Sequence, residues 1–341
     1  MKMEKSDFLK EPVRHIDIKS FDSTEIIESM RDMSFTARDT AAAADILIKM
    51  INDEECTIML CIAGSTSAAG CMQIYVDMVK HNMVDVIVAT GATIVDMDFF
   101  EALGFQHYKG NPYVDDKILR ELYIDRIYDT LIDEEQLQVC DNTIKEIADL
   151  LAPGPYSSRE FIRQMGKYLV KNNAKKPNSL VQTAYENDVP IFCPAFSDSS
   201  AGFGLVKHQV VNEDNHISID SVKDFRELTE IKIKSPVSGL FMIGGGVPKN
   251  FAQDTVVCAE ILGEHANMHK YAVQITVADV RDGACSSSTL KEAHSWGKVN
   301  TLYEQMVYAE ATSVLPLIIS YVYHSRSWEN RYQRQLNKIF E

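Results

Sequence analysis

Short apolar runs alternate with amphipathic stretches along most of this chain. Runs of strand length occur at Cys56–Ala63, Val84–Thr90, Ile191–Phe196, Gly239–Ile243 and Tyr271–Thr276. Apolar positions recur with helical spacing over Asp22–Met33, Thr36–Asn52, Cys71–His81, Asp141–Leu151, Ser157–Lys171, Ser221–Thr229 and Ala309–Tyr323. Strands that alternate with helices are typical of a parallel sheet with helices on both faces. The pattern therefore predicts a doubly wound α/β fold whose central sheet is mainly parallel.

The first fifty or so residues differ from the rest because they contain no strand pattern. Residues 1–20 show few packing signals, so we predict an arm there, and the spacing of Asp22 and Glu25 predicts a capping box. We expect residues 1–52 to form an N-terminal helical arm packed on a main domain of residues 53–341.

Turns of small or polar residues follow the predicted strands. They lie at 64–70, 90–96, 197–204, 244–249 and 277–288. In a parallel sheet such turns meet at the carboxyl edge, where ligands bind and helix N-termini attract phosphates. Gly244-Gly245-Gly246 is a weak signal by itself, because tight packing of a helix on a strand explains it as well as a cofactor does.

Charge and composition narrow the choice of partner. The chain has 34 Lys and Arg against 49 Asp and Glu, a net charge of −15, which argues against a nucleic-acid or anionic-membrane surface. The seven cysteines and nine histidines show no metal-ligand spacing, so no metal site is expected. No apolar run approaches the roughly 20 residues of a membrane helix, and the N-terminus lacks a signal core. A cytoplasmic protein is expected.

The segment Glu292-Ala-His-Ser-Trp-Gly-Lys298 carries the strongest chemical signal. A lysine becomes a nucleophile when its amine is neutral, and an apolar wall such as the Trp296 indole favours that form by desolvation. The indole face can also hold a cation. The alternative is a solvated loop lysine beside a buried core tryptophan.

From Cys56 to Pro316 the sequence resembles the deoxyhypusine synthase family. The segments that carry the resemblance are Cys56-Thr-Ile-Met-Leu, His81-Asn-Met-Val-Asp-Val-Ile-Val, Gly244-Gly-Gly-Val-Pro-Lys, Tyr271-Ala-Val and, above all, Glu292–Lys298. The resemblance implies a Rossmann-like domain and a homotetramer with active sites at subunit interfaces.

The resemblance also implies a reaction. The family oxidises spermidine with NAD, captures the aminobutyl group on a lysine as an imine, and passes it to an acceptor amine. Lys298 would be the nucleophile, Trp296 would line the amine channel, and Glu292 would bind a cationic amine end. The residues matched to the cofactor side are Ser65, Thr90, Gly91, Ala92, Asp96, Asp198, Gly245, Ala278, Asp282 and Glu310.

Departures from the family pattern concentrate on the amine side. Asn250 stands where the family has a histidine proposed as a proton shuttle, and Phe203 and Cys285 replace two amine-binding aspartates. Gly283, beside Cys285, is matched to the same side. Each lost carboxylate removes a partner for an ammonium group, worth about 1–3 kcal/mol. The cofactor side changes less: Asp96 stands for a glutamate and Glu310 for an aspartate.

Three functions follow as alternatives. The first is NAD-dependent transfer of an aminobutyl group from a polyamine such as spermidine to a lysine of a translation factor. The second is a homospermidine-synthase-like transfer to a free diamine. The third is an NAD-binding protein that has lost catalysis and acts by interaction.

Overall fold

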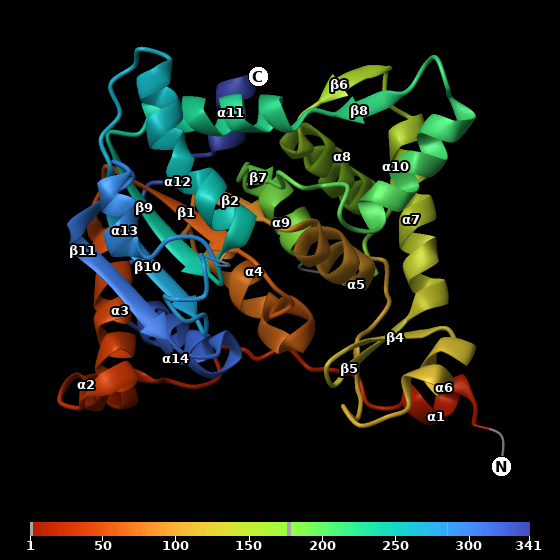
Figure 1. Cartoon of the computed structure of the whole chain (residues 1–341), viewed down its shortest axis with the longest axis horizontal. Coiled ribbons are helices and arrows are strands. Elements are labelled where there is room, and N and C mark those ends of the chain that lie inside the picture. Colours follow the sequence, from red (N-terminus) through yellow and green to blue (C-terminus); the bar gives the residue numbers. More distant parts are fainter. Residues whose placement is uncertain (1–2, 176–178, 285) are drawn as a thin grey trace.

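A single six-stranded sheet forms the centre of the computed structural model, which describes residues 3–175, 179–284 and 286–341 (Figure 1). Every strand pair in it is parallel, and the strand order is β11-β10-β9-β1-β2-β7. The strands are β1 Cys56–Ile62, β2 Val86–Ala89, β7 Ile191–Phe192, β9 Val237–Ile243, β10 His269–Thr276 and β11 Val299–Tyr308. Counted along the chain this is the order 3-2-1-4-5-6 of the doubly wound Rossmann fold, as predicted.

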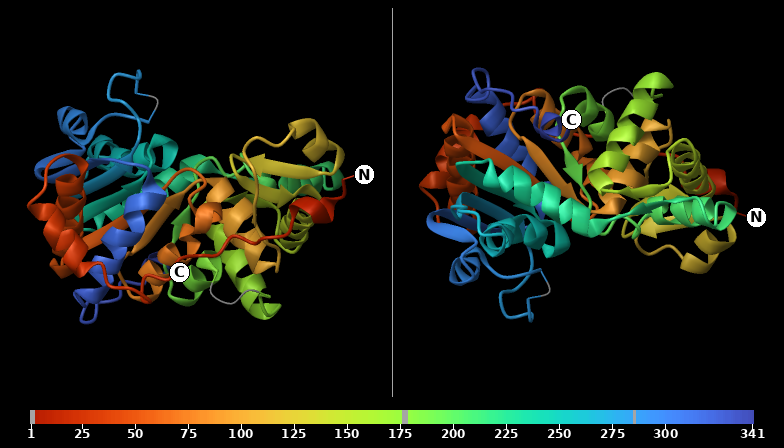
Figure 2. Two further views of the ribbon diagram at one scale, coloured as in Figure 1. Left: turned by 90° about the horizontal axis from the view of Figure 1, so that it is seen from below. Right: turned by 90° about the horizontal axis from the view of Figure 1, so that it is seen from above.

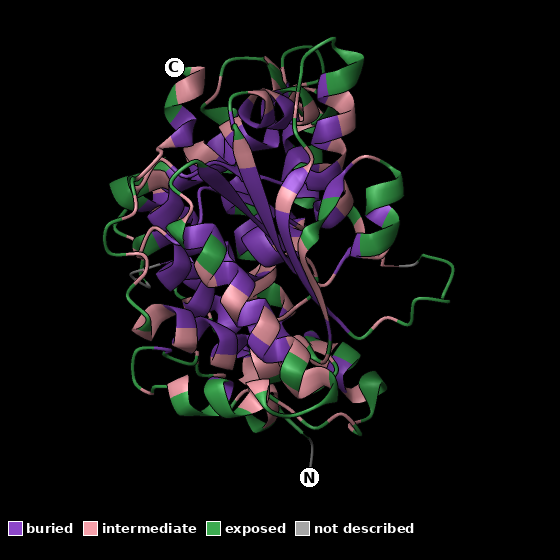
Figure 3. Ribbon diagram, turned by 90° about the vertical axis from the view of Figure 1, so that its left-hand side faces the viewer, coloured by how far each residue is buried: buried purple, intermediate pink, exposed green. Residues whose placement is uncertain are grey.

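Alternating side chains of the strands feed two cores, one on each face of the sheet. In β1, Ile58 and Leu60 face one core, whereas Met59 and Cys61 face the other. The first core is covered by α2 Thr24–Arg31, α3 Phe35–Asn52, α4 Met72–Lys80, α8 Ser158–Lys171, α9 Leu180–Glu186 and α14 Ala311–His324. The second is covered by α11 Ser221–Ile233, α12 Gly246–Ile261, α13 Leu290–Ser295 and the 3₁₀ turn η3 Leu336–Phe340. Figure 3 shows the buried strands between these layers and the exposed turns outside them.

A second lobe lies beyond β7. It contains the antiparallel sheet β3-β5-β4 and the short parallel pair β6-β8, with long helices beside them (Figure 1). Its elements are β3 Tyr108–Lys109, α6 Asp116–Glu121, β4 Ile124–Ile127, β5 Thr130–Asp133, α7 Glu134–Asp149, β6 Gly154–Tyr156, α10 Ser200–Val211 and β8 Ile217–Ile219. The π-helical turn η2 Ala92–Phe99, followed by α5 Phe100–Ala102, leads from β2 of the main sheet to β3 of this lobe. A second π-helical turn, η1 Ser67–Cys71, lies between β1 and α4 in the main lobe.

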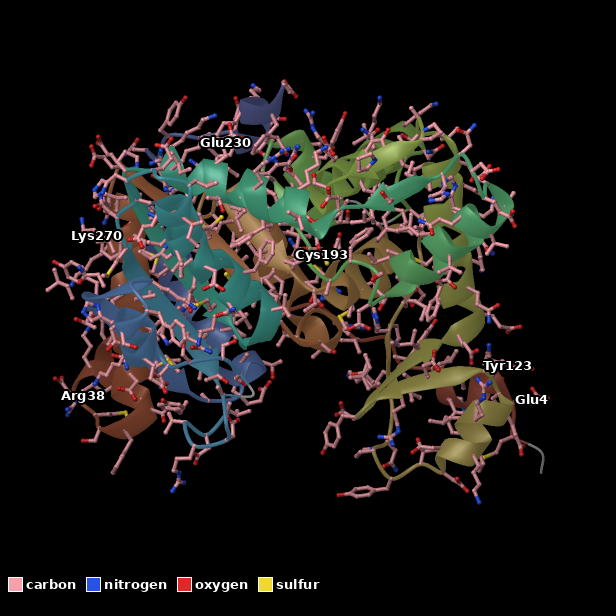
Figure 4. All side chains as sticks on the ribbon, turned by 45° about the horizontal axis from the view of Figure 1, so that its top comes forward. Glu4, Arg38, Tyr123, Cys193, Glu230 and Lys270 are labelled. Carbon is pink, nitrogen blue, oxygen red and sulfur yellow. The ribbon has the colours of Figure 1, made fainter. Side chains whose placement is uncertain are left out.

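The N-terminal arm spans both lobes. Its helix α1 Lys5–Phe8 is tied to the second lobe by Lys5, whose Nζ lies 2.7 Å from a carboxylate oxygen of Asp133. The arm then runs along the molecule, and the Ile16 amide donates to the carbonyl of Gly70 at 2.9 Å (Figure 2). Figure 4 labels Glu4 beside Tyr123 in the second lobe and Arg38 at the opposite end. The arm is therefore an ordered strap.

Several predicted boundaries are wrong for identifiable reasons. The predicted capping box between Asp22 and Glu25 does not form. The N-cap of α2 is Ser23 rather than Asp22, the helix begins at Thr24, and Asp22 accepts from the amide of Thr24. Helix α7 begins at Glu134, where the Asp133 carboxylate caps the amide of Glu135. The predicted strand Ile191–Phe196 ends at Phe192. Ser157, by contrast, caps α8 as predicted.

Two elements beside the candidate site went unpredicted. Helix α13 is only six residues long. Strand β11 lies at the edge of the sheet and is mostly half-buried or exposed, so it lacks the continuous apolar pattern of the central strands. None of the described helices is long and apolar enough to cross a membrane.

Candidate active site

Local helix-ending geometry places Lys298. Thr289 and Glu292 form a capping box at the start of α13. At its end, the Gly297 amide donates to His294 O at 3.0 Å and the Lys298 amide donates to Ala293 O at 3.1 Å. This is a Schellman motif, and Gly297 supplies the positive φ of +72° that it needs. Lys298 is thus fixed as the residue that connects α13 to β11.

The side chain of Lys298 is buried and paired. The residue is only 7% exposed, and its Nζ lies 2.5 Å from Oδ1 of Asp254. Nζ also donates to Oδ1 of Asn250 at 3.3 Å, and Asn250 Nδ2 donates to Asp254 Oδ2 at 2.8 Å. The amine therefore sits in a triangle of polar groups rather than against an apolar wall alone.

The two partners of Lys298 lie on one face of α12. Asn250, Asp254, Val257, Cys258 and Ile261 are spaced as neighbours on a helix surface, and all five line a cavity of about 860 Å³. The cavity is closed on its other sides by residues from three further segments: Phe225, Ala284, Ser287, Ser288, Glu292, Ser295, Trp296 and Lys298. It combines two carboxylates and one ammonium with an apolar wall.

The exposures of Trp296 and Lys298 are the reverse of those in the alternative interpretation, which had a solvated lysine beside a buried tryptophan. The indole is 66% exposed, whereas the lysine is buried. Lys298 Nζ lies 5.2 Å from the centroid of the Trp296 ring, which is within reach of a cation–π contact. A solvated lysine beside a core tryptophan is therefore not what this chain forms.

Glu292 has a structural partner as well as a place at the cavity. Its Oε2 accepts from the Thr289 amide at 2.7 Å, and the hydrogen bonds from Thr289 lower the pKa of this carboxyl. The side chain also lines the cavity that holds Lys298. Glu292 can therefore attract a cation there while it starts α13.

A second lysine lies behind the first. Lys249, on α12, is 1% exposed, and its Nζ donates to Gln274 Oε1 at 2.7 Å and to the carbonyl of Ser288. Burial lowers its pKa to about 8. Lys249 thus connects α12 to two other parts of the chain. Gln274 belongs to β10, and Ser288 belongs to the loop after β10 and lines the cavity.

Most of the residues predicted for the cofactor lie beyond the carboxyl ends of strands in the main sheet. Ser65 follows β1, and Thr90, Gly91 and Ala92 follow β2; Asp198, Gly245, Ala278 and Glu310 follow later strands. Asp282 belongs to the same turn as Ala278, and both line a cavity of about 340 Å³. Because the strands are parallel, these turns share one edge of the sheet.

Two acidic groups at this edge have partners inside the chain. Asp96 lies in η2, its Oδ1 accepts from the Ser200 amide at 2.7 Å, and burial raises its pKa to about 6. Burial would raise the pKa of Glu310 too, but hydrogen bonds from Thr312 and Ser313 lower it. Glu310 is the N-cap residue of α14, and its Oε2 accepts from the hydroxyls of Thr312 and Ser313 in the first turn of that helix.

The residues that depart from the family pattern are not gathered in one place. Asn250 contacts Lys298, as described. Phe203, on α10, is 64% exposed and lines a different cavity with Asp141 and Lys207. Gly283 lies in the exposed loop after β10, which projects from the body of the molecule (Figure 2). Cys285 lies outside the described residues.

The sequence analysis missed Asp254. A signal was present, because Asp254 follows Asn250 by four positions in a helical pattern and so shares its face. What could not be foreseen was that this face of α12 meets the start of β11. Among the described residues, no cluster of three or more His, Cys, Asp or Glu side chains could hold a metal ion.

Comparison with known proteins gives these features a context. A family model described as "Deoxyhypusine synthase" matches residues 25–322. The chain is 68% identical over 337 residues to a "Deoxyhypusine synthase-like protein" of Coxiella burnetii, covering 99% of this chain and 96% of the relative. It is 64% identical over 340 residues to a protein of the same name from Caulobacter vibrioides, covering 99% and 93%.

More distant relatives carry related names. "Probable deoxyhypusine synthase 2" of Methanosarcina mazei is 36% identical over 326 residues, covering 95% of this chain and 93% of the relative. A crystal structure of a provisionally assigned deoxyhypusine synthase from Entamoeba histolytica superposes with a TM-score of 0.60. It shares 21% identity and covers 94% of this chain and 99% of that one. This last similarity concerns the fold alone.

Proposed function

Because the chain belongs to the deoxyhypusine synthase family, we propose that it transfers an aminoalkyl group from a polyamine to an acceptor amine through an imine on Lys298. The observation that carries the proposal is the burial of Lys298 against a carboxylate at the wall of a cavity of about 860 Å³. An ordinary structural lysine has no need of a cavity at its amine.

The carboxyl edge fits the dinucleotide that the family implies. The first turn of α12 has no capping side chain, because its N-cap is Gly245, and a Cβ on Gly246 would meet nothing within 4 Å. Helix N-termini of this kind bind pyrophosphate groups. NAD bound there would supply a reversible acceptor for a hydride from the carbon beside the amine nitrogen. Ser65, Gly91, Gly245 and their neighbours would hold it.

The chain's own residues bind and orient the amine. Asp254 and Glu292 contribute two negative charges to the cavity and Lys298 one positive charge, so the balance favours a cation. Phe225, Val257 and Trp296 offer an apolar wall to a methylene chain. This combination suits an amine with an apolar stretch and few charges better than a long, multiply charged polyamine.

The test is borohydride trapping with NAD and either spermidine or putrescine as the donor. The wild-type chain should form NADH and carry a reduced adduct on Lys298. Lys298→Ala should lose transfer by at least about 1,000-fold, the scale of a lost covalent intermediate, while NAD binding persists. Lys291→Ala is the matched control, since Lys291 is an exposed lysine on α13, the helix that precedes Lys298.

The acceptor is decided in the same assay. Product that appears with a free diamine supports a homospermidine-synthase-like reaction, and product that appears on a translation-factor lysine supports deoxyhypusine synthesis. NAD binding without NADH formation or an adduct, with every amine tried, contradicts the proposal and favours a protein that acts by interaction.

A further inference from the structure

Asn250 cannot exchange a proton at neutral pH. It therefore cannot serve as the proton acceptor that imine formation on Lys298 requires. An amine that arrives as an ammonium must lose a proton before it attacks carbon, and a group within hydrogen-bond reach must take that proton. Asn250 has an amide side chain, which offers only fixed donors and an acceptor. The proton acceptor must therefore come from another residue that touches Nζ.

Asp254 is the carboxylate that the described part of the chain brings to this amine. Its Oδ1 lies 2.5 Å from Lys298 Nζ. Its Oδ2 accepts from Asn250 Nδ2 at 2.8 Å, which fixes the plane of the carboxylate so that the other oxygen points at the lysine. Glu292 is held elsewhere, since its carboxylate accepts from the Thr289 amide.

Exposure separates the two members of the pair. The Lys298 side chain is 9% exposed, whereas that of Asp254 is 31% exposed and lines the cavity. A proton taken by Asp254 can therefore pass to water or to a bound amine, which a proton on the enclosed lysine cannot do directly. The position four residues before it, Asn250, holds the carboxylate and stays uncharged.

We propose that Asp254 is the catalytic acid–base group for imine formation on Lys298, a role that rests on the proposed Lys298 chemistry and adds its proton carrier. Asp254 takes one proton from the ammonium, and the neutral Nζ forms a bond to the carbonyl or imine carbon. Asp254 delivers that proton to the carbonyl oxygen or imine nitrogen as its double bond to carbon opens. It then takes a second proton from Nζ and delivers it to the same atom, which departs as the double bond to Nζ forms.

The step balances without an oxidant or reductant. With an aldehyde, the Lys298 ammonium loses two of its three protons, both leave with the carbonyl oxygen as water, and the product is a protonated imine. With a substrate imine, the same two protons leave on the released amine as its ammonium. The carbon–nitrogen bond to Lys298 forms as the bond to the leaving atom breaks, and Asp254 returns to its carboxylate form.

The opposing explanation is that Asp254 only neutralises a buried charge. It predicts that alkylation of Lys298 stays unchanged or becomes faster in the variant, because the ion pair no longer holds Nζ at the carboxylate. The sign of the change therefore separates a proton carrier from a counter-charge.

The experiment measures alkylation of Lys298 by butanal with cyanoborohydride, followed by peptide mass spectrometry. It needs neither NAD nor an amine donor, so its result is independent of whether the transfer reaction occurs. Asp254→Asn keeps the shape and the contact with Asn250 but removes acid–base capacity. We expect Lys298 alkylation to fall about 100-fold, within the usual range for a positioned acid–base group.

Controls are available within the chain. Lys270 forms an ion pair with Asp53 at 2.7 Å outside the cavity, so Asp53→Asn should leave Lys270 alkylation unchanged or raise it. Asp254→Glu, or added formate with Asp254→Ala, should restore part of the Lys298 rate, which also shows that these variants are folded. Alkylation of Lys298 that is unchanged or faster in Asp254→Asn overturns the proposal.

Discussion

The carboxyl edge of the sheet and the cavity at Lys298 are built on different principles. At the edge, glycines and small residues follow one strand after another, and the backbone defines the positions. In the cavity, charged side chains from α12 and from the α13–β11 junction define them. A site made of turns needs only the strand order, whereas a site made of side chains also needs a specific packing of two elements.

Gly245 lies where the carboxyl edge meets the loop that lines the Lys298 cavity. Its substitution should therefore impair both regions at once. A Cβ there would lie 2.2 Å from the carbonyl oxygen of Ser286, so Gly245→Ala must displace the loop that carries Ser287 and Ser288. We expect loss of transfer by more than about 100-fold, with both NAD affinity and Lys298 alkylation reduced, because a displacement of about 1 Å is costly in catalysis. Calorimetry and the alkylation assay measure the two effects separately.

The control for this variant is Gly246→Ala. Its φ of +62° makes alanine unfavourable, but a Cβ would meet nothing within 4 Å. It should lower thermal stability modestly and leave the loop in place. Equal effects of the two variants on alkylation would show that the displacement of Ser286 is not the cause.

Gly91→Ala should impair the carboxyl edge without affecting the Lys298 cavity. Its Cβ would lie 2.6 Å from Oγ of Ser199, at the edge and away from the residues that line the Lys298 cavity. We expect NAD affinity to fall about 10- to 100-fold while butanal alkylation of Lys298 stays at the wild-type rate. Adding Ser199→Gly should restore part of the affinity, since glycine costs a helix N-cap only a few tenths of a kcal/mol.

The choice between NAD and NADP tests the acidic residues of the edge. An acid at the ribose 2′-hydroxyl disfavours a 2′-phosphate, so the wild type should bind NAD at least about 10-fold more tightly than NADP. Asp282→Asn and Glu310→Gln should each narrow that ratio several-fold by calorimetry. If Glu310 serves only to cap α14, its variant will lower stability and leave the ratio unchanged.

The smallest expected effect concerns pH and Asp96. Burial raises its pKa from 3.8 to about 6, so the folded chain binds this proton more tightly than the unfolded chain. Stability therefore falls as the pH rises from about 4 through about 6, and the ionised group costs at most roughly 3 kcal/mol above that range. Asp96→Asn, which keeps an acceptor for the Ser200 amide, should be about 1–2 kcal/mol more stable at pH 8.

Denaturant unfolding at pH 4 and pH 8 checks this linkage. The advantage of Asp96→Asn should nearly vanish at pH 4. Asp116→Asn is a useful contrast, because the hydrogen bond from Arg126 lowers the pKa of Asp116. Its effect should also be larger at pH 8 than at pH 4, but it should be a loss of stability rather than a gain. A pH-independent gain in Asp96→Asn would contradict a role for its ionisation.

Much of the fold could be predicted because it rests on local patterns. The buried strands around Cys61 and Met242 are apolar on both faces, and the turns after them are rich in small residues, so the parallel sheet follows. Strand β11 could not be predicted, because an edge strand is half-exposed and lacks that pattern. The second lobe depends on non-local pairings, such as Gly154 with Ile217, that no periodicity shows.

The candidate site divides in the same way. Lys298 could be picked out because a lysine that follows Trp296 and Gly297 is a local signal, and the Schellman motif at Gly297 explains the glycine. Its pairing with Asp254 could not, since it joins positions 44 residues apart, one on α12 and the other at the junction of α13 and β11. The exposures of Trp296 and Lys298 could not be predicted either, because they too depend on contacts between segments that are distant in the sequence.

The N-terminal strap has a consequence for how the chain is made. Ser23 donates to the carbonyl of Leu317 across 294 positions, and Ser320 donates back to Phe21. At 5–20 residues per second, the ribosome needs roughly 15–60 s to synthesise that interval. Residues 21–23 are therefore synthesised long before the part of α14 that they contact. A tag or fusion at the N-terminus would be carried through this whole delay, whereas one at the C-terminus would appear only after it.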